Sequence, residues 1–221
     1  IDPYQTMFDE KTFSSCSSLT NLIIGSSVKN IEKFDFKLFG NLTDITIPDT
    51  VTTLDNYSFS GLTTLKKVLI PKSVISIGNN CFSNCTSLNN VVIPDSVTMI
   101  NEKAFSNCTS LSQVILSNSI SSIEGYCFSS CSLLTNLIIP SSINSIKSYS
   151  FVDCSSLIEI VIPPSVISIH DYAFLRCKSL KKVLIPSSVE FIGEFVFSSC
   201  TSLTEISIPS SVTELKNSLY H

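Results

Sequence analysis

A repeat of 23 residues is the feature of this sequence that most limits its fold. Phenylalanine recurs at this interval, and leucine recurs six residues after each phenylalanine. A unit this short cannot bury its own apolar side, so successive units must stack on one another. The first two series are Phe13, Phe36, Phe59, Phe82, Phe105, Phe128, Phe151, Phe174 and Phe197, and Leu19, Leu42, Leu65, Leu88, Leu111, Leu134, Leu157, Leu180 and Leu203.

The repeated unit reads F-x-x-C-x-x-L-x-x-V-x-I-P-x-S-V-x-x-I. Its segment L-x-x-V-x-I predicts one short strand, which ends at a proline because proline cannot donate to a continuing strand ladder. Units laid parallel at the ~4.8 Å spacing of strands would bury a continuous core. We therefore predict an α/β solenoid of about nine repeats, with a parallel β-sheet on the concave face. The F-x-x-C segment is expected to form a short helical or 3₁₀ turn on the convex face.

Residues 1–221 are predicted to form a single solenoid domain. Tyr220 falls 23 residues after Phe197, where a tenth unit would begin, and no polar capping unit is visible at either end. Because a solenoid must cover its terminal core faces, we expect either a piece of a longer array or an end covered by self-association.

The units IPSSVEFIGEFVFSSCTSLTEISIP (185–209) and IPDSVTMINEKAFSNCTSLSQVILS (93–117) resemble BspA-type leucine-rich repeats, also called the Treponema type. Such proteins are typically surface-associated or secreted, in bacteria and in mucosal protist parasites such as Trichomonas and Entamoeba. The resemblance implies a leucine-rich-repeat solenoid that acts as a non-enzymatic protein-binding or adhesion module. The implied location is the cell surface or the exterior, and the implied partner is a host or extracellular protein. An intracellular scaffold and a homodimeric structural repeat protein are the alternatives.

The repeat also identifies the residues that face outward from the predicted sheet. The position before the central strand residue is polar in every unit, and the position after it is aliphatic in seven of nine units. An exposed apolar stripe with a polar rim is typical of a contact surface, although aliphatic residues also simply favour strands. We predict that this concave face binds a protein, either a foreign ligand or a second copy of the chain. The predicted ligand-binding residues are Lys67, Leu69, Val92, Gln113, Ile115, Asn136, Ile138, Glu159, Val161, Lys182 and Leu184.

Composition excludes several other classes of function. Charged residues make up only 14%, the net charge is -4, and no run of like charge occurs. Nucleic-acid binding depends on clustered Lys and Arg, so we expect none. No run of ~18 apolar residues predicts a membrane-inserted segment, and IDPYQTMFDE lacks the pattern of a signal peptide. Motifs such as G-x-G-x-x-G or H-E-x-x-H are absent, and the carboxylates form no recurring pair. We therefore expect no enzymatic activity and no cofactor.

Seven of the nine cysteines share one register of the repeat, where Phe39 and Leu62 replace them in two units. A position that accepts Cys, Phe or Leu is an apolar core position, which predicts buried free thiols. Neighbouring turns would place these Cα atoms ~5 Å apart, so disulfide formation on oxidation is an alternative. The spacing of Cys81 with Cys85 suits zinc weakly because the histidines lie in other units, and no metal site is predicted. The register holds Cys16, Cys85, Cys108, Cys131, Cys154, Cys177 and Cys200.

Two further patterns allow both a functional and a structural interpretation. Four N-x-[ST] sequons, at Asn41, Asn56, Asn84 and Asn107, could carry glycans on a eukaryotic secretory route, although the repeat itself supplies two of them. Aromatic residues also lie two positions before the repeated phenylalanine in successive units. They are interpreted as a packing ladder, with a convex binding strip as the alternative. These aromatic residues are Tyr126, Tyr149, Tyr172 and Phe195.

Overall fold

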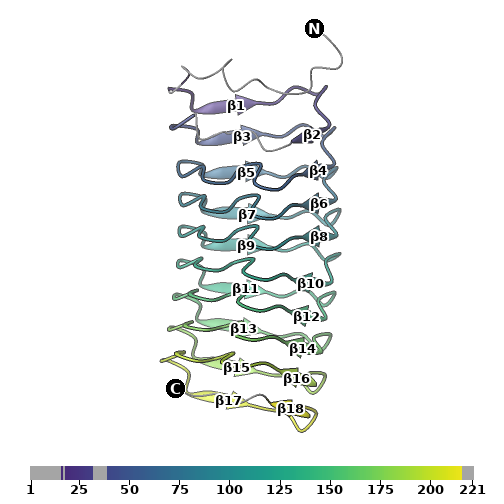
Figure 1. Ribbon diagram of the computed structural model, residues 1–221, viewed down its shortest axis with the longest axis vertical. Helices are drawn as coiled ribbons and strands as arrows, with labels where there is room; N and C mark the ends of the chain where they lie inside the picture. The colour runs from purple at the N-terminus through teal and green to yellow at the C-terminus, as the bar shows by residue number, and fades with distance from the viewer. Residues whose placement is uncertain (1–15, 17, 32–38, 216–221) are drawn as a thin grey trace.

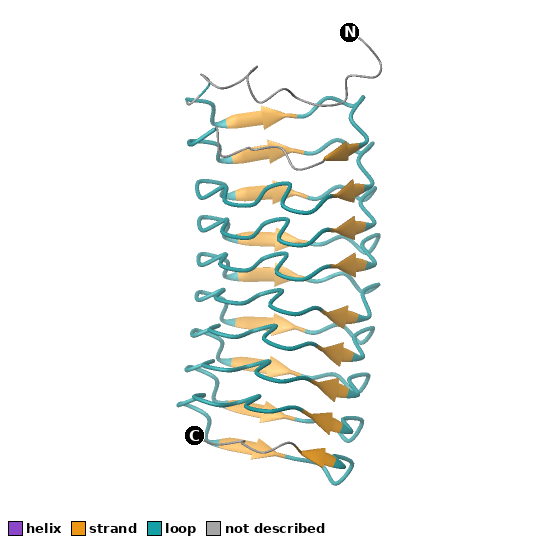
Figure 2. Ribbon diagram, in the orientation of Figure 1, coloured by secondary structure: helices purple, strands orange, loops and turns teal. Residues whose placement is uncertain are grey.

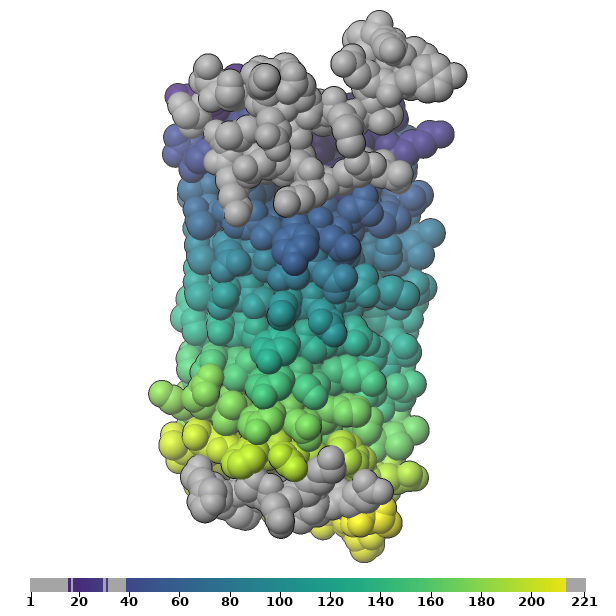
Figure 3. Space-filling view, in the orientation of Figure 1, coloured from purple at the N-terminus to yellow at the C-terminus, as the bar shows by residue number. Residues whose placement is uncertain are grey.

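The computed structural model describes residues 16, 18–31 and 39–215, which form a stack of coils with two columns of short strands (Figure 1). In the space-filling view the coils follow one another as bands from purple to yellow (Figure 3). The odd-numbered strands are β1 (Asn21–Ile23), β3 (Asp44–Thr46), β5 (Lys67–Leu69), β7 (Asn90–Val92), β9 (Gln113–Ile115), β11 (Asn136–Ile138), β13 (Glu159–Val161), β15 (Lys182–Leu184) and β17 (Glu205–Ser207). The even-numbered strands are β2 (Asn30–Ile31), β4 (Thr53–Leu54), β6 (Ser76–Ile77), β8 (Met99–Ile100), β10 (Ser122–Ile123), β12 (Ser145–Ile146), β14 (Ser168–Ile169), β16 (Phe191–Ile192) and β18 (Glu214–Leu215).

All strand pairs are parallel, and each residue pairs with its counterpart in the next unit, as Leu137 does with Ile160. The odd-numbered strands form two sheets, ordered β1-β3-β5-β7-β9 and β11-β13-β15-β17. The even-numbered strands form sheets ordered β2-β4-β6-β8 and β10-β12-β14-β16-β18. Both interruptions adjoin the coil in which Ser117 replaces the proline of the repeat. There the buried Ser117 hydroxyl donates to the Val97 carbonyl at 2.6 Å.

The core lies between the strands and the turns, and a column of stacked phenylalanines runs through it. From Phe59 to Phe197 successive ring centroids are 5.2–5.7 Å apart and the ring planes differ by at most 13°. This is within the range of favourable offset stacking. The leucine series packs with it, and Leu65, Leu88 and Leu111 are fully buried. The predicted parallel solenoid and its apolar registers are confirmed.

The prediction of helical turns on the side opposite the odd-numbered strands is wrong: the described residues contain no helix (Figure 2). Backbone donors along this segment alternate between two kinds of acceptor. The Phe82 N–H donates to the Ala104 carbonyl of the next coil at 2.7 Å, whereas the Ser83 N–H donates to the Asn80 carbonyl at 3.1 Å. Asn80 and Asn84 have φ values of 54° and 59°. These left-handed residues interrupt any helix and turn every second N–H towards the neighbouring coil.

The even-numbered strands are a second difference from the prediction, because the sequence predicted one strand per unit and the structure has two. After seven of the nine odd-numbered strands a proline begins a β-turn, as in the donation from the Val74 N–H to the Pro71 carbonyl at 3.1 Å, and Gly25 and Ser117 stand in its place after β1 and β9. The Ser73 hydroxyl donates to the Val51 carbonyl of the preceding coil at 2.6 Å, which holds successive turns together. The chain then re-enters an extended conformation and buries Ile77.

Three residues used to define the repeat, Phe13, Phe36 and Tyr220, lie outside the described residues. The nine odd-numbered strands and the nine even-numbered strands nevertheless agree with a stack of about nine repeats.

Truncating one ring in the phenylalanine column should destabilise the stack strongly. Phe128→Ala removes a fully buried ring that stacks on both Phe105 and Phe151, so we expect the free energy of unfolding to fall by about 3–5 kcal/mol. Urea unfolding followed by circular dichroism measures this loss. Met99→Ala, at a side chain that is 53% exposed, is the control and should change the free energy of unfolding by less than about 0.5 kcal/mol. Equal losses for both variants would show that the column does not hold the stack together.

Candidate functional site

The outer surface of the odd-numbered strands, here called the sheet face, carries a continuous column of exposed aliphatic side chains. In each central strand the middle residue is buried and the first and third are exposed. The third residues form the apolar stripe, and their side chains are 55–85% exposed. These are Leu69, Val92, Ile115, Ile138, Val161 and Leu184. Thr46 and Ser207 flank the stripe as polar neighbours in the same column.

The first residues of the same strands form a polar column beside the stripe. They are all exposed, and opposite charges are adjacent wherever two charged residues are neighbours. Lys182 Nζ lies 3.0 Å from Glu205 Oε1, and both side chains remain about half exposed or more. The polar column comprises Asn21, Asp44, Lys67, Asn90, Gln113, Asn136, Glu159, Lys182 and Glu205.

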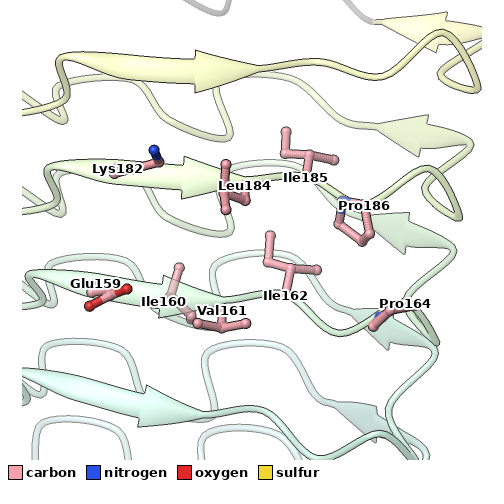
Figure 4. Close-up of a pocket in the computed structure, with 9 residues that line it drawn as sticks. All are labelled: Glu159, Ile160, Val161, Ile162, Pro164, Lys182, Leu184, Ile185 and Pro186. Atoms are coloured by element: carbon pink, nitrogen blue, oxygen red, sulfur yellow. The ribbon is translucent and has the colours of Figure 1, made fainter.

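A shallow depression of about 350 Å³ lies where the two columns adjoin in β13 and β15. Figure 4 shows Glu159 and Lys182 together at one end of these strands, with Val161 and Leu184 next to them and Pro164 and Pro186 beyond. It is an open, mostly apolar surface and not an enclosed cavity that would surround a small molecule.

All eleven residues predicted to bind a ligand lie on the sheet face. The sequence placed them there through the alternation of buried and exposed strand residues. Ile23, which is 73% exposed at the same strand position, belongs to the column as well, but Thr46 separates it from the stripe. The depression was not expected, because its wall includes the prolines that follow the strands. Binding by these residues remains a prediction.

Comparison with known proteins places the repeats in a family. The model of the BspA type leucine-rich repeat region matches residues 6–134 and 122–221. The chain belongs to the BspA-type leucine-rich repeat family. Leucine-rich repeat proteins commonly bind other proteins, and this family is typically non-enzymatic.

Solved structures of bacterial leucine-rich repeat proteins have the same fold. A protein from Bacteroides ovatus is 28% identical over 90% of this chain and 69% of its own, with a TM-score of 0.68. The Treponema pallidum leucine-rich repeat protein is 28% identical over 76% of this chain and 80% of its own, with a TM-score of 0.70. A leucine-rich cell surface protein of Faecalibacterium prausnitzii shares the fold at 23% identity, covering 78% of this chain and 61% of its own, with a TM-score of 0.51. Comparison with curated protein sequences gave no match.

The cysteine register of this BspA-type chain forms a column of buried free thiols, as predicted for six of its seven members. Cys16 is the exception, because it is exposed. Each buried Sγ in the register donates to the carbonyl of the phenylalanine 26 residues earlier, as Cys108 does to Phe82 at 3.1 Å. Burial raises the pKa of Cys85 and Cys154 to about 12. These thiols therefore act as structural hydrogen-bond donors and are poor nucleophiles.

Among residues 16, 18–31 and 39–215, no three His, Cys, Asp or Glu side chains converge on a point that could hold a metal ion. The same residues include no helix of the length and apolarity required to span a bilayer.

The aromatic residues of the turns form a packing ladder, which confirms that interpretation. The rings of Tyr126, Tyr149, Tyr172 and Phe195 stack with centroids 4.6, 4.7 and 5.2 Å apart. All four residues have φ values of 54–60°, an uncommon conformation for aromatic residues. Lys103 Nζ lies 5.2 Å from the centroid of the Tyr126 ring. Since each inner ring is covered on both faces by its neighbours, the ladder offers a ligand ring edges and few free ring faces.

All four sequon asparagines are exposed, so each could receive a glycan. Asn107 Nδ2 donates to Asn84 Oδ1 at 3.1 Å, and Asn56 Oδ1 accepts from the Asn79 backbone N–H at 2.7 Å. These contacts give the asparagines a structural role in joining coils, and glycosylation remains a prediction.

Thiol reactivity should distinguish Cys16 from the other cysteines. Burial raises the pKa of all eight buried thiols, so they are almost entirely protonated near pH 8 and should react with a disulfide reagent only on unfolding. We expect one fast-reacting thiol per native chain, and nine in denaturant. Cys16→Ser should remove the fast phase. Several fast thiols in the native chain would contradict the burial described above.

Proposed function

We propose that the sheet face is a non-enzymatic protein-binding surface centred on the apolar stripe. The observation that carries the proposal is the run of six aliphatic side chains on successive strands, each more than half exposed, in register within each of the two sheets and adjacent where β9 meets β11. Contiguous exposed apolar patches that are bordered by polar residues often mark interaction sites.

The surroundings of the stripe also suit a protein partner. Charged and amide side chains of the polar column line it, as the polar rim lines the apolar centre of a typical interface. The depression at Val161 and Leu184 could accept one apolar side chain of a partner. The sequence carries few charges and no run of basic residues, which favours a protein over a nucleic acid as partner.

Substitution at the centre of the stripe should abolish binding without unfolding the chain. Ile138→Lys places a charge at the most exposed stripe residue, which is 85% exposed, so the fold should tolerate it. We would select random phage-displayed peptides on the wild-type chain and measure their affinity for both proteins. Peptides rich in apolar residues should bind the variant at least about tenfold more weakly, a loss of about 1.4 kcal/mol.

The matched control is Ile167→Lys, because Ile167 is 50% exposed and lies next to β14, outside the sheet face. It should bind the selected peptides as the wild type does. Equal binding by all three proteins would refute the proposal, as would selection of no peptide by a chain that also fails to associate with itself.

We further propose that the protein containing this chain acts in adhesion at the cell surface or in secreted form. The resemblance of the repeats to those of surface-associated proteins supports this location. An antibody raised against the chain should label intact, unpermeabilised cells that produce it, or detect the chain in their medium. Labelling that appears only after permeabilisation would instead favour an intracellular scaffold.

A further inference from the structure

The charges along the polar column are complementary to those of a second polar column that runs in the opposite direction. Gln113 in β9 is its midpoint. Asp44 and Lys182 lie three coils from it on opposite sides, and Lys67 and Glu159 lie two coils from it on opposite sides. Both of these pairs therefore carry opposite charges, whereas the outermost pair, Asn21 and Glu205, combines an amide with a carboxylate. The residues one coil from the midpoint, Asn90 and Asn136, are both amides.

We propose that the partner of the sheet face is a second copy of this chain, packed in an antiparallel twofold dimer centred on Gln113 and Ile115. The inference rests on the proposed function, because it names an occupant for the same surface. A twofold axis that lies between the two faces and parallel to the strands preserves the strand direction and reverses the order of the coils. Each copy then presents the same patch to the other, as an isologous interface requires.

This arrangement places polar column against polar column. Lys67 faces the partner's Glu159, and Asp44 faces the partner's Lys182. Symmetry repeats both pairs, so four ion pairs form. Lys182 already contacts Glu205 of its own chain at 3.0 Å, but its side chain is 49% exposed and can approach a second carboxylate.

The same axis places apolar stripe against apolar stripe. Leu69 faces the partner's Val161, Val92 faces the partner's Ile138, and Ile115 faces its own copy. Two sheets that pack face to face lie ~10 Å apart, a distance that interdigitated aliphatic side chains fill.

The charges also select this register over its neighbours. A slip of one coil in one direction would bring Asp44 opposite the partner's Glu159. A slip in the other direction would bring Lys67 opposite the partner's Lys182. A dimer with the coils in the same order would place the polar column against the apolar stripe, which would desolvate charges without pairing them.

The contact area indicates a weak dimer. Three residues at ~3.3 Å along each strand and seven coils at ~4.8 Å give on the order of 350 Å² per copy, below the roughly 800 Å² per partner of standard stable interfaces. Association should therefore depend on concentration over the micromolar range and weaken with salt.

Sedimentation equilibrium tests the proposal on four forms of the chain, each checked for folding by circular dichroism. The wild-type mass should rise towards twice the monomer mass between about 5 µM and about 500 µM at low salt. Lys67→Glu and Glu159→Lys should each associate at least about tenfold more weakly, because each creates two like-charge contacts across the axis. An equimolar mixture of the two variants should recover wild-type association, since each introduced charge meets its opposite in the mixed dimer. Lys72→Glu, an equal charge change on the same coil but outside the strand, should behave as the wild type does.

Three outcomes would overturn the dimer. These are a wild-type chain that is monomeric throughout the series, single variants that associate as the wild type does, and a mixture that associates no better than its components.

The peptide measurement with Ile138→Lys separates this inference from the proposed function. A monomeric chain whose peptide binding depends on Ile138 rejects only the dimer, whereas a dimer that needs Lys67 and Glu159 but selects no peptide rejects only the binding of foreign partners.

Discussion

The structure depends on one constraint: each residue lies directly against its counterpart one repeat later. Backbone donors in the strands, and every second donor in the turns, reach carbonyls of the adjacent coil, as the Phe151 N–H reaches the Ala173 carbonyl at 2.8 Å. A single coil leaves these groups unpaired and exposes its apolar side, so no coil is stable alone. The phenylalanine column, the thiol column and the apolar stripe all follow from this one repeat distance.

Stacking of equivalent positions favours some side chains and penalises others. Rings and aliphatic groups gain contact from an identical neighbour, whereas like charges about 5 Å apart repel one another. Charged neighbours accordingly alternate in sign, as in Asp153 with Arg176, whose side chains are joined by two hydrogen bonds. Arg176 in turn holds the pKa of Asp153 below its usual value, first through these hydrogen bonds. Asp171 and Glu194 are an exception, and there the Asp171 carboxylate accepts the backbone N–H of Glu194. The penalty accounts for the low content of charged residues.

The sequence predicted those features that depend on the period and on alternation along a strand. It identified the parallel stack, the inward registers and the exposed stripe because all the units agree on these positions. It did not predict the left-handed turn residues, since Tyr149 and Lys103 have side chains that seldom adopt a positive φ and do so here because neighbouring coils hold them. The two-residue strands were missed because hydrogen bonds to adjacent coils, more than local propensity, define them. The site was predictable as a surface, but aliphatic side chains of a flat stripe do not specify a ligand in the way that a metal-binding or catalytic cluster does.

The repeat distance also determines which changes of length the gene can accept. Duplication or loss of 23 codons adds or removes one coil and leaves every remaining contact of the same kind. The sheet face then lengthens or shortens by ~4.8 Å. Insertion of a single codon within a strand would move the following residues to the opposite face of the sheet and break the columns. Evolution can therefore change the length of the stripe only in steps of one whole coil.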